Sequence, residues 1–290
     1  MKHDYALAHL TVLSLTPPQV IDAAARAGYA YASLRVTRVT PAEPLYDLGR
    51  DRALMRETKA RMAATGVRVH DVELFRMDPT LEPEHFAAEL DATAELGAKH
   101  IICQLPDPDR ARADARFARL CDMAKPLGIF VSLEFPHWTE TGNLTEAARV
   151  VRAAGKDNGG ILIDMLHMGR SNSSAAELAR LPREWFRFAH VCDADARCPD
   201  TMEGIIRTAR DERCFPGEGT IDVKGILAAL PPDIPYSLEI PRMTLTHAVG
   251  PYEVARLAVL ACRAELDGER WQPAQAAARG RSARPARVSA

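Results

Sequence analysis

Short apolar runs alternate with amphipathic, helix-like segments along most of the chain, and this alternation restricts the fold more than any other feature of the sequence. Eight runs are rich in Val, Ile and Leu and are too short for helices, as is typical of strands buried on both faces. We predict strands at Tyr5–Thr11, Ala30–Val36, Val67–Glu73, His100–Cys103, Ile129–Glu134, Gly160–Asp164, Phe188–Cys192 and Tyr236–Ile240.

A glycine follows each of five segments that lie between these runs. Glycine adopts the left-handed backbone conformation that commonly ends a helix, so its position predicts where each helix stops. The helices expected on this basis are Pro18–Ala27, Asp51–Thr65, Pro83–Leu96, Asp114–Leu127 and Thr145–Ala154.

Eight strands alternating with helices predict an α/β fold with a parallel sheet and right-handed crossovers. The 290 residues suit a single (β/α)8 TIM barrel, which needs roughly 250. A doubly wound open sheet is the alternative, but the chain has no GxGxxG or P-loop phosphate turn. We assign residues 1–268 to the barrel and predict that residues 269–290 form a disordered basic tail. The long segment Asp193–Thr220 is typical of a functional loop.

Polar side chains stand at the ends of the four late strands, where catalytic groups of such barrels are found. Glu134 ends the fifth strand, Asp164 ends the sixth, His190 lies in the seventh and Glu239 ends the eighth. Three carboxylates in one dry barrel mouth would repel one another strongly, and a divalent cation removes that repulsion. One imidazole with three carboxylates suits Mn²⁺ best, with Mg²⁺, Co²⁺ or Zn²⁺ as alternatives.

The residues around these positions resemble those of the xylose-isomerase-like TIM-barrel superfamily, the sugar phosphate isomerase/epimerase group. The resemblance spans roughly Tyr5 to Leu266. It rests on LEF around Glu134, IDMLHMGRS around Asp164, FAHVCDAD around His190, PGEGTID around Glu218 and SLEIP around Glu239.

The resemblance to ketohexose epimerases of this group implies the same four metal ligands, with Glu134 and Glu239 acting also as the catalytic acid and base. It further implies that His167, three residues after the aspartate, contacts the substrate. An arginine shortly after the metal histidine should do likewise, and Arg197 is the nearest candidate.

Further polar residues are candidates for substrate binding because guanidinium groups bind carboxylates and phosphates in a bidentate manner. Arg35 closes the second strand and Arg170 follows the aspartate turn, whereas Glu73 lies nearest the end of the third strand. Each arginine can equally pair with a neighbouring acid. Glu218, between two glycines, either approaches the metal region or has only a structural role in its turn.

Composition excludes several classes of function. The net charge of −2 leaves no basic surface for nucleic acid or an anionic membrane, and no apolar run is long enough to span a bilayer. Six cysteines without a CxxC pair, and a start unlike a secretory signal, predict a cytoplasmic protein with reduced thiols. A small sugar or keto acid is the expected partner, and the resemblance also implies a homo-oligomer.

Three functions remain open from the sequence. The first is a metal-dependent isomerase or epimerase of a small polyhydroxy ketone or its phosphate, working through a metal-stabilised enediolate. The second is a metal-dependent dehydratase of a 3-dehydroshikimate- or inosose-like ring, because the same proton abstraction precedes loss of a β-hydroxyl. The third is a non-catalytic metal- or sugar-binding barrel. An endonuclease IV-like activity is set aside because the chain has only nine histidines and no basic groove.

Overall fold

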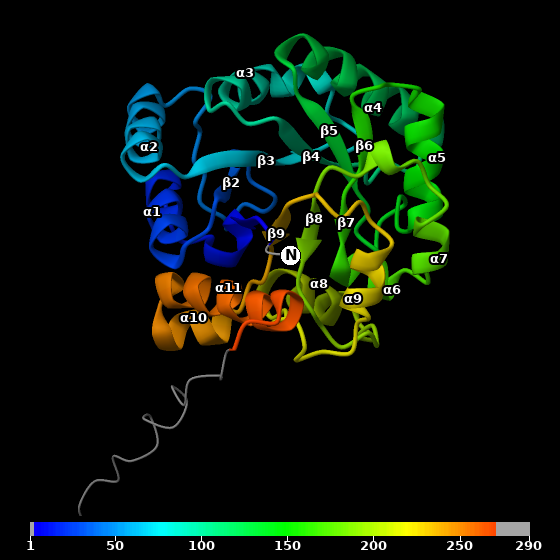
Figure 1. Cartoon of the computed structure of the whole chain (residues 1–290). Helices are drawn as coiled ribbons and strands as arrows, with labels where there is room; N and C mark the ends of the chain where they lie inside the picture. Colours follow the sequence, from blue (N-terminus) through cyan, green and yellow to red (C-terminus); the bar gives the residue numbers. More distant parts are fainter. Residues whose placement is uncertain (1–2, 271–290) are drawn as a thin grey trace, which may run out of the picture.

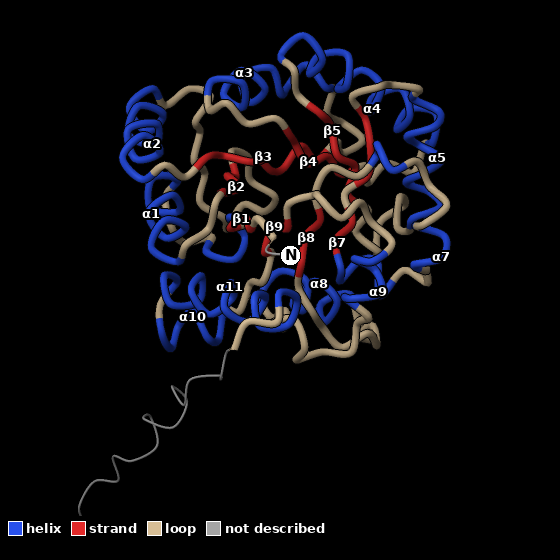
Figure 2. Tube along the Cα trace, in the orientation of Figure 1, coloured by secondary structure: helices blue, strands red, loops and turns tan. Residues whose placement is uncertain are grey.

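The computed structural model describes residues 3–270 of the chain. Its strands form a ring inside a layer of helices (Figure 1). Figure 2 shows the strands at the centre and the helices around them. The strands are β1 Tyr5–Leu7, β2 Tyr31–Arg35, β3 Arg68–Arg76, β4 His100–Gln104, β5 Phe130–Glu134, β6 Gly159–Ile161, β7 Ile163–Asp164, β8 Ala189–Val191 and β9 Tyr236–Leu238. Almost all of the predicted tail lies outside the described residues.

All strand pairs are parallel, in the order β6-β5-β4-β3-β2-β1-β9-β8-β7. Only Leu162 separates β6 from β7, and its N–H donates to the carbonyl of Leu133 on β5. The segments β6 and β7 are therefore two halves of one strand that pairs with β5 at one end and β8 at the other. The ring corresponds to the predicted eight-stranded (β/α)8 barrel, which is confirmed.

The helices between the strands end where the glycines predict. Gly28, Gly66 and Gly155 each adopt a left-handed conformation directly after α1, α2 and α5. The helices are α1 Pro17–Ala27, α2 Arg52–Thr65, α3 Ala87–Glu95, α4 Arg110–Ala124, α5 Leu144–Ala154, α6 Met165–Arg170, α7 Ala175–Leu178, α8 Met202–Asp211, α9 Val223–Ala228, α10 Met243–Val249 and α11 Pro251–Asp267. Short 3₁₀ turns are η1 His9–Val12, η2 Pro83–Phe86, η3 Lys125–Leu127 and η4 Arg183–Trp185.

The hydrophobic core has two parts. The larger part fills the space between the sheet and the helices, where the apolar faces of strands and helices meet. The smaller part closes the inside of the barrel and consists of Leu74, Ile102, Leu162 and Phe188. Because side chains fill the barrel in this way, the interior is a packed core and only its ends can hold a ligand.

Several element boundaries differ from the predictions, and two of these differences have a clear local cause. The first strand stops at Leu7 rather than Thr11, because His9 to Val12 form the turn η1. The helix α4 starts at Arg110, four residues before the predicted Asp114, because the side chain of Asp109 caps it by accepting from the N–H of Arg112. Among residues 3–270, none of the helices has the length and apolar character that crossing a bilayer requires.

Candidate metal centre

Four strand ends bring the predicted metal ligands together at the carboxyl end of the barrel. Glu134 is the last residue of β5, Asp164 is the last of β7, His190 lies in β8 and Glu239 directly follows β9. All four side chains are buried, and one ligand atom from each lies within 4.8 Å of the others. The parallel register explains this arrangement, because Asp164 pairs with His190 and each strand ends at the same rim.

The spacing of these ligand atoms, and the lack of hydrogen-bond partners for several of them, are what a binding site for a divalent cation requires. His190 Nδ1 lies 3.6 Å from Glu134 Oε1, 3.6 Å from Asp164 Oδ2 and 3.4 Å from Glu239 Oε2. Neither ring nitrogen of His190 has a hydrogen-bond partner, and Glu134 Oε1 has none. When two ligand atoms each lie about 2.1 Å from the same ion, they lie roughly 3–4 Å from each other. The separations in this cluster match that distance. When several buried polar atoms without hydrogen-bond partners meet at one point, they indicate a binding site for a ligand that all of them contact.

The charges of the cluster shift the pKa of each member. Burial alone would lower the pKa of His190, but the carboxylates of Glu239, Asp164 and Glu134 outweigh it and raise that pKa well above its usual value. Burial alone would raise the pKa of Asp164 and of Glu239, yet the neighbouring cations lower both. A bound divalent cation would therefore displace a proton from His190 and meet carboxylates that are already ionised.

Arg213 supplies much of the positive charge in the cluster. Its Nη1 lies 2.6 Å from Asp164 Oδ2 and its Nη2 lies 2.7 Å from Glu239 Oε2, and the guanidinium is buried. The residue comes just after α8, in the long segment between β8 and β9. The residues predicted from the sequence to line the site did not include Arg213. The length of that segment was the only signal.

Gln104 fixes the orientation of Glu134. It is the last residue of β4, is in register with Glu134 on β5, and its Nε2 donates to Glu134 Oε2 at 2.5 Å. The other carboxylate oxygen, Oε1, is thereby left to face His190. The prediction missed Gln104 because the predicted strand stopped one residue earlier, at Cys103.

His167 lies beside the cluster, as predicted. Its backbone N–H donates to Asp164 Oδ1 at 3.1 Å, and its buried side chain lines the cavity at the metal ligands. Burial lowers the pKa of the imidazole, so the ring is neutral at neutral pH. His137 and Trp138 pack around it, with 3.1 Å between the Nδ1 atoms of the two histidines and 5.1 Å between the indole and imidazole ring centres.

Arg35 and Glu73 also line this cavity, and they pair with each other. Arg35 Nη2 lies 3.1 Å from Glu73 Oε2, and its Nη1 lies 3.2 Å from Glu43 Oε2. Burial raises the pKa of Glu73, although Arg35 opposes the shift. The pair therefore sits where a substrate bound at the metal would meet it.

The structure places the other two predicted substrate residues away from the cavity. Arg170 donates from Nε and Nη2 to the carbonyl of Asp195, at 3.1 and 2.8 Å. The Arg197 side chain is 78% exposed and pairs with Asp200 at 3.4 Å. Glu218 pairs with Arg242 at 2.6 Å and accepts from the N–H of Phe215, which is the structural role in a turn. Substrate contact by Arg170 and Arg197 stays a prediction.

Asp193 organises the segment that carries Arg213. This buried carboxylate accepts from the N–H groups of Gly217 and Gly219, both at 3.0 Å, and of Ile221 at 3.2 Å. Gly217 has a φ of +88°, a conformation that favours glycine. The PGEG turn thus wraps around a buried acid, and the turn fixes the segment that follows Arg213.

A sequence profile of the xylose isomerase-like TIM-barrel family matches residues 21–260 of the chain. The protein belongs to this family. The predicted resemblance is thereby confirmed, and the late-strand motifs that carried it are those that hold the metal centre.

Curated relatives of this family member include two kinds of enzyme. An inosose isomerase of Bacillus licheniformis is 25% identical over 157 residues, which cover 51% of this chain and 54% of the relative. A 3-dehydroshikimate dehydratase of Pseudomonas aeruginosa is 29% identical over 153 residues, covering 50% of this chain and 23% of the relative. The chain thus matches about half of the isomerase and under a quarter of the dehydratase.

Solved structures share the fold over nearly the whole chain. The IolI protein with a bound zinc atom has a TM-score of 0.75 and 18% identity, covering 91% of this chain and 98% of its own. A D-allulose 3-epimerase from Methylomonas sp. has a TM-score of 0.67 and 18% identity, covering 91% and 97%. At such identities the likeness shows the barrel and leaves the reaction open.

Proposed function

We propose that this xylose isomerase-like barrel is a divalent-metal-dependent isomerase or epimerase of a small polyhydroxy ketone or sugar. The observation that carries the proposal is the buried set of Glu134, Asp164, His190 and Glu239, whose ligand atoms lie within 4.8 Å of one another. Inosose isomerases among the relatives and sugar epimerases among the similar structures support the same class of reaction. Mn²⁺ is the metal that we expect, from the oxygen-rich ligand set.

When bound, the cation would polarise a substrate carbonyl and stabilise negative charge on the adjacent oxygens. The chain's own residues would move the proton. Glu134 and Glu239 come from β5 and from the residue after β9, so they approach the cavity from different strands. One carboxylate removes the proton from the carbon beside the carbonyl, and the other returns one, which inverts the centre or moves the carbonyl. Gln104 and Arg213 hold the two carboxylates in position.

A dehydratase is the second candidate, favoured by a specific observation. Arg35, Arg210 and Arg213 all line the cavity, and guanidinium groups suit a substrate that carries a carboxylate. A 3-dehydroshikimate dehydratase is among the relatives. The same proton abstraction followed by loss of a β-hydroxyl would give an unsaturated ketone.

Deuterium exchange from D₂O into a panel of ketoses and cyclic keto acids tests the proposal, with and without EDTA. Exchange that depends on Mn²⁺ and loses no water supports isomerisation, whereas an ultraviolet-absorbing enone indicates the dehydratase. Glu134→Gln should abolish exchange and weaken Mn²⁺ binding, while Glu140→Gln, an exposed glutamate in the following loop, serves as the matched control. Mn²⁺ binding without exchange in any substrate would contradict the proposal and favour a non-catalytic barrel.

A further inference from the structure

Three side chains form a hydrogen-bonded relay that leads from the rim of the barrel to the metal cavity. Cys198 Sγ lies 3.5 Å from His137 Nε2, and His137 Nδ1 lies 3.1 Å from His167 Nδ1. Cys198 and His137 are half-buried, whereas His167 is buried and lines the metal cavity. The three residues come after β8, β5 and β7, so only the folded barrel brings them together. We call them the thiol–imidazole relay.

The remaining ring nitrogen of His167, Nε2, is the end of the relay that a substrate can reach. Within residues 3–270, no protein group forms a hydrogen bond with this atom, although Nδ1 of the same ring is engaged by His137. A neutral imidazole donates from one nitrogen and accepts at the other. The position of a single proton therefore decides whether His167 offers a substrate a donor or an acceptor.

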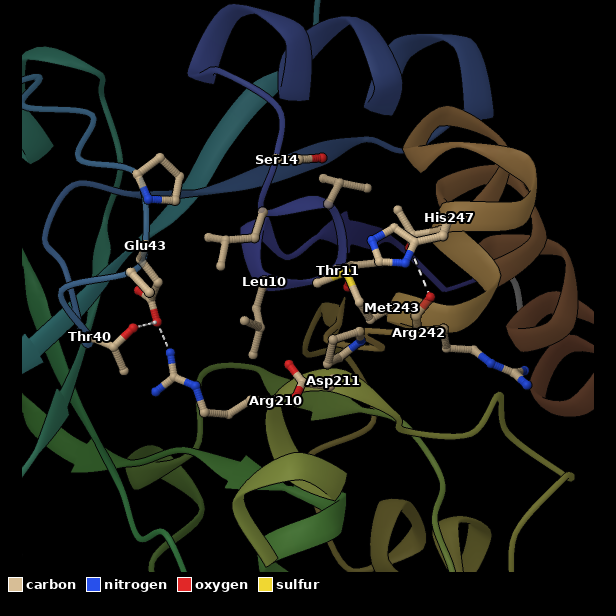
Figure 3. Close-up of a pocket in the computed structure, with 16 residues that line it drawn as sticks. Leu10, Thr11, Ser14, Thr40, Glu43, Arg210, Asp211, Arg242, Met243 and His247 are labelled. Carbon is tan, nitrogen blue, oxygen red and sulfur yellow. Dashed lines mark hydrogen bonds and ion pairs between the residues drawn. The ribbon is translucent and has the colours of Figure 1, made fainter. Parts of the chain in front are cut away.

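The space around the metal shows which part of a substrate would meet His167. The metal cavity has a volume of only about 50 Å³, and a cavity of about 400 Å³ adjoins it through Leu10 and Arg210, which line both (Figure 3). Thr11 and Asp211 bring polar groups to the larger cavity, so hydroxyl groups of the proposed substrate can extend into it. His167 lines the metal cavity but not the larger one. It would therefore contact the reacting end.

Cys198 determines the proton position at the outer end of the relay. A thiol sulfur is only a weak acceptor, whereas the unprotonated nitrogen of an imidazole accepts well. Burial lowers the pKa of His137 to about 3, so at neutral pH this ring is uncharged and carries one proton. The S–H group of Cys198 therefore donates to His137 Nε2, and the proton of the imidazole lies on Nδ1.

The contact between the two imidazoles passes this choice on to His167. Two N–H groups that point at each other across 3.1 Å would repel, so only one of the two Nδ1 atoms carries a proton. Since Nδ1 of His137 donates, Nδ1 of His167 accepts, and the proton of the second ring lies on Nε2. Trp138 supports both rings edge-on, with ring centres 5.0 Å from His137 and 5.1 Å from His167.

We propose that Cys198 and His137 are positioning residues that set the tautomer of His167, so that its Nε2–H donates to a substrate oxygen in the metal cavity. This inference rests on the proposed function, because it assigns that oxygen to a polyhydroxy ketone. Loss of a proton from the neighbouring carbon places negative charge on the oxygen. A neutral donor already aimed at the oxygen stabilises this charge and keeps its own proton. The other tautomer would present a lone pair and repel the charge.

Nitrogen-15 NMR of labelled histidine measures the tautomer directly, because protonated and unprotonated ring nitrogens differ strongly in chemical shift. The full-length protein is loaded with Mg²⁺, which is diamagnetic and does not broaden the signals as Mn²⁺ would. We expect the wild type to carry a proton on Nδ1 of His137 and on Nε2 of His167. Cys198→Ala removes the donor and should move the His167 proton toward Nδ1.

Two further variants separate the hydrogen bond from the packing of the cysteine. Cys198→Ser retains a hydroxyl donor and should keep the wild-type tautomers. Cys214→Ala removes a half-buried thiol of the same segment and should leave the histidine signals unchanged. A His167 ring protonated on Nδ1 in the wild type, or a tautomer that Cys198→Ala does not move, would overturn the inference.

Catalysis provides a second readout that packing alone would not move in the same way. In Cys198→Ala, kcat for exchange of substrate hydrogen should fall, by up to roughly 100-fold if the donor is lost entirely. KM should change much less, because the donor acts on charge that develops in the transition state. The expected tautomers in a protein that exchanges no substrate would uphold the relay and contradict the proposed enzyme instead.

Discussion

Arg213 partly replaces a cation within the metal cluster. Its two terminal nitrogens lie at 2.6 and 2.7 Å from oxygens of Asp164 and Glu239. Those oxygens, Oδ2 and Oε2, are also the atoms that lie nearest His190 Nδ1. The guanidinium therefore offsets the repulsion of carboxylates that would otherwise be uncompensated without metal, and it stays close enough to hold them when metal binds.

This arrangement predicts that Arg213→Met makes the stability of the protein depend on metal. Removal of one partner from a buried ion pair costs about 3–5 kcal/mol, so the melting temperature in EDTA should fall by several degrees or more. Added Mn²⁺ should restore most of the loss, because it neutralises the same oxygens. Thermal unfolding with EDTA and with Mn²⁺ measures both effects. An unchanged melting temperature in EDTA would show that Arg213 has no such role.

The four metal ligands could be predicted from the sequence because three of them stand at the end of an apolar run and His190 interrupts a fourth. The parallel strands of a barrel all end at the same rim, so polar residues at those ends lie close together regardless of the path of the loops. Arg213 and Arg197 show the limit of this reasoning. Both lie in the segment between β8 and β9, and the path of that segment depends on the hydrogen bonds to Asp193 rather than on any periodic pattern.

At the scale of elements, the turn η1 takes the place of the predicted end of the first strand. The apolar run from Tyr5 to Thr11 reads as one strand, yet the backbone leaves the sheet after Leu7. Thr11 then lies against β9, where its Oγ1 donates to the carbonyl of Leu238 at 2.7 Å and accepts from the N–H of Ile240 at 2.8 Å. These partners come from the far end of the chain, so no local pattern could reveal them.

Thr11 brackets the metal ligand Glu239, because its two partners are the residues before and after it. Thr11→Val keeps the shape, but it leaves the buried N–H of Ile240 without this acceptor and the carbonyl of Leu238 with one donor fewer, which should cost about 1–3 kcal/mol. Mn²⁺ affinity should also fall, because the segment that carries Glu239 is no longer fixed. Thr11→Ser retains the hydroxyl and is the matched control. Chemical denaturation and Mn²⁺ titration provide the two measurements, and equal values for the Val and Ser variants would contradict this role.

At the scale of the whole molecule, the two ends of the barrel differ in character. The carboxyl end holds the charged cluster, whereas a group of rings gathers around the amino ends of the strands. His70 stacks on His100 with ring centres 4.8 Å apart, and Phe188 lies edge-on to His70 at 4.8 Å. Phe130 lies edge-on to His100 at 6.1 Å. The amino end thus contributes packing, and the imidazole of His100 must stay neutral to do so.

This packing predicts acid sensitivity that does not involve the metal centre. Burial lowers the pKa of His100 to about 3, with His70 and Arg187 adding to the shift and Asp71 opposing it. The Nδ1 of His100 is buried without a hydrogen-bond partner. In the unfolded chain this histidine has an ordinary pKa of about 6.5, so below that pH the unfolded state binds a proton that the folded state does not bind. The stabilising contribution is therefore complete above about pH 6.5 and is lost as the pH falls.

His100→Phe should remove this contribution, because phenylalanine fits among the same rings and does not titrate. Between pH 7 and pH 5 the free energy of unfolding of the wild type should fall by roughly 2 kcal/mol more than that of the variant. Guanidinium unfolding at both pH values measures the difference, with metal content held equal. His85→Phe, at an exposed position, serves as the control and should follow the wild type. If His100→Phe also followed the wild type, the acid sensitivity would have to arise elsewhere. The next residues to replace would then be the buried His9 and the half-buried His137, whose pKa values burial lowers to about 4 and about 3.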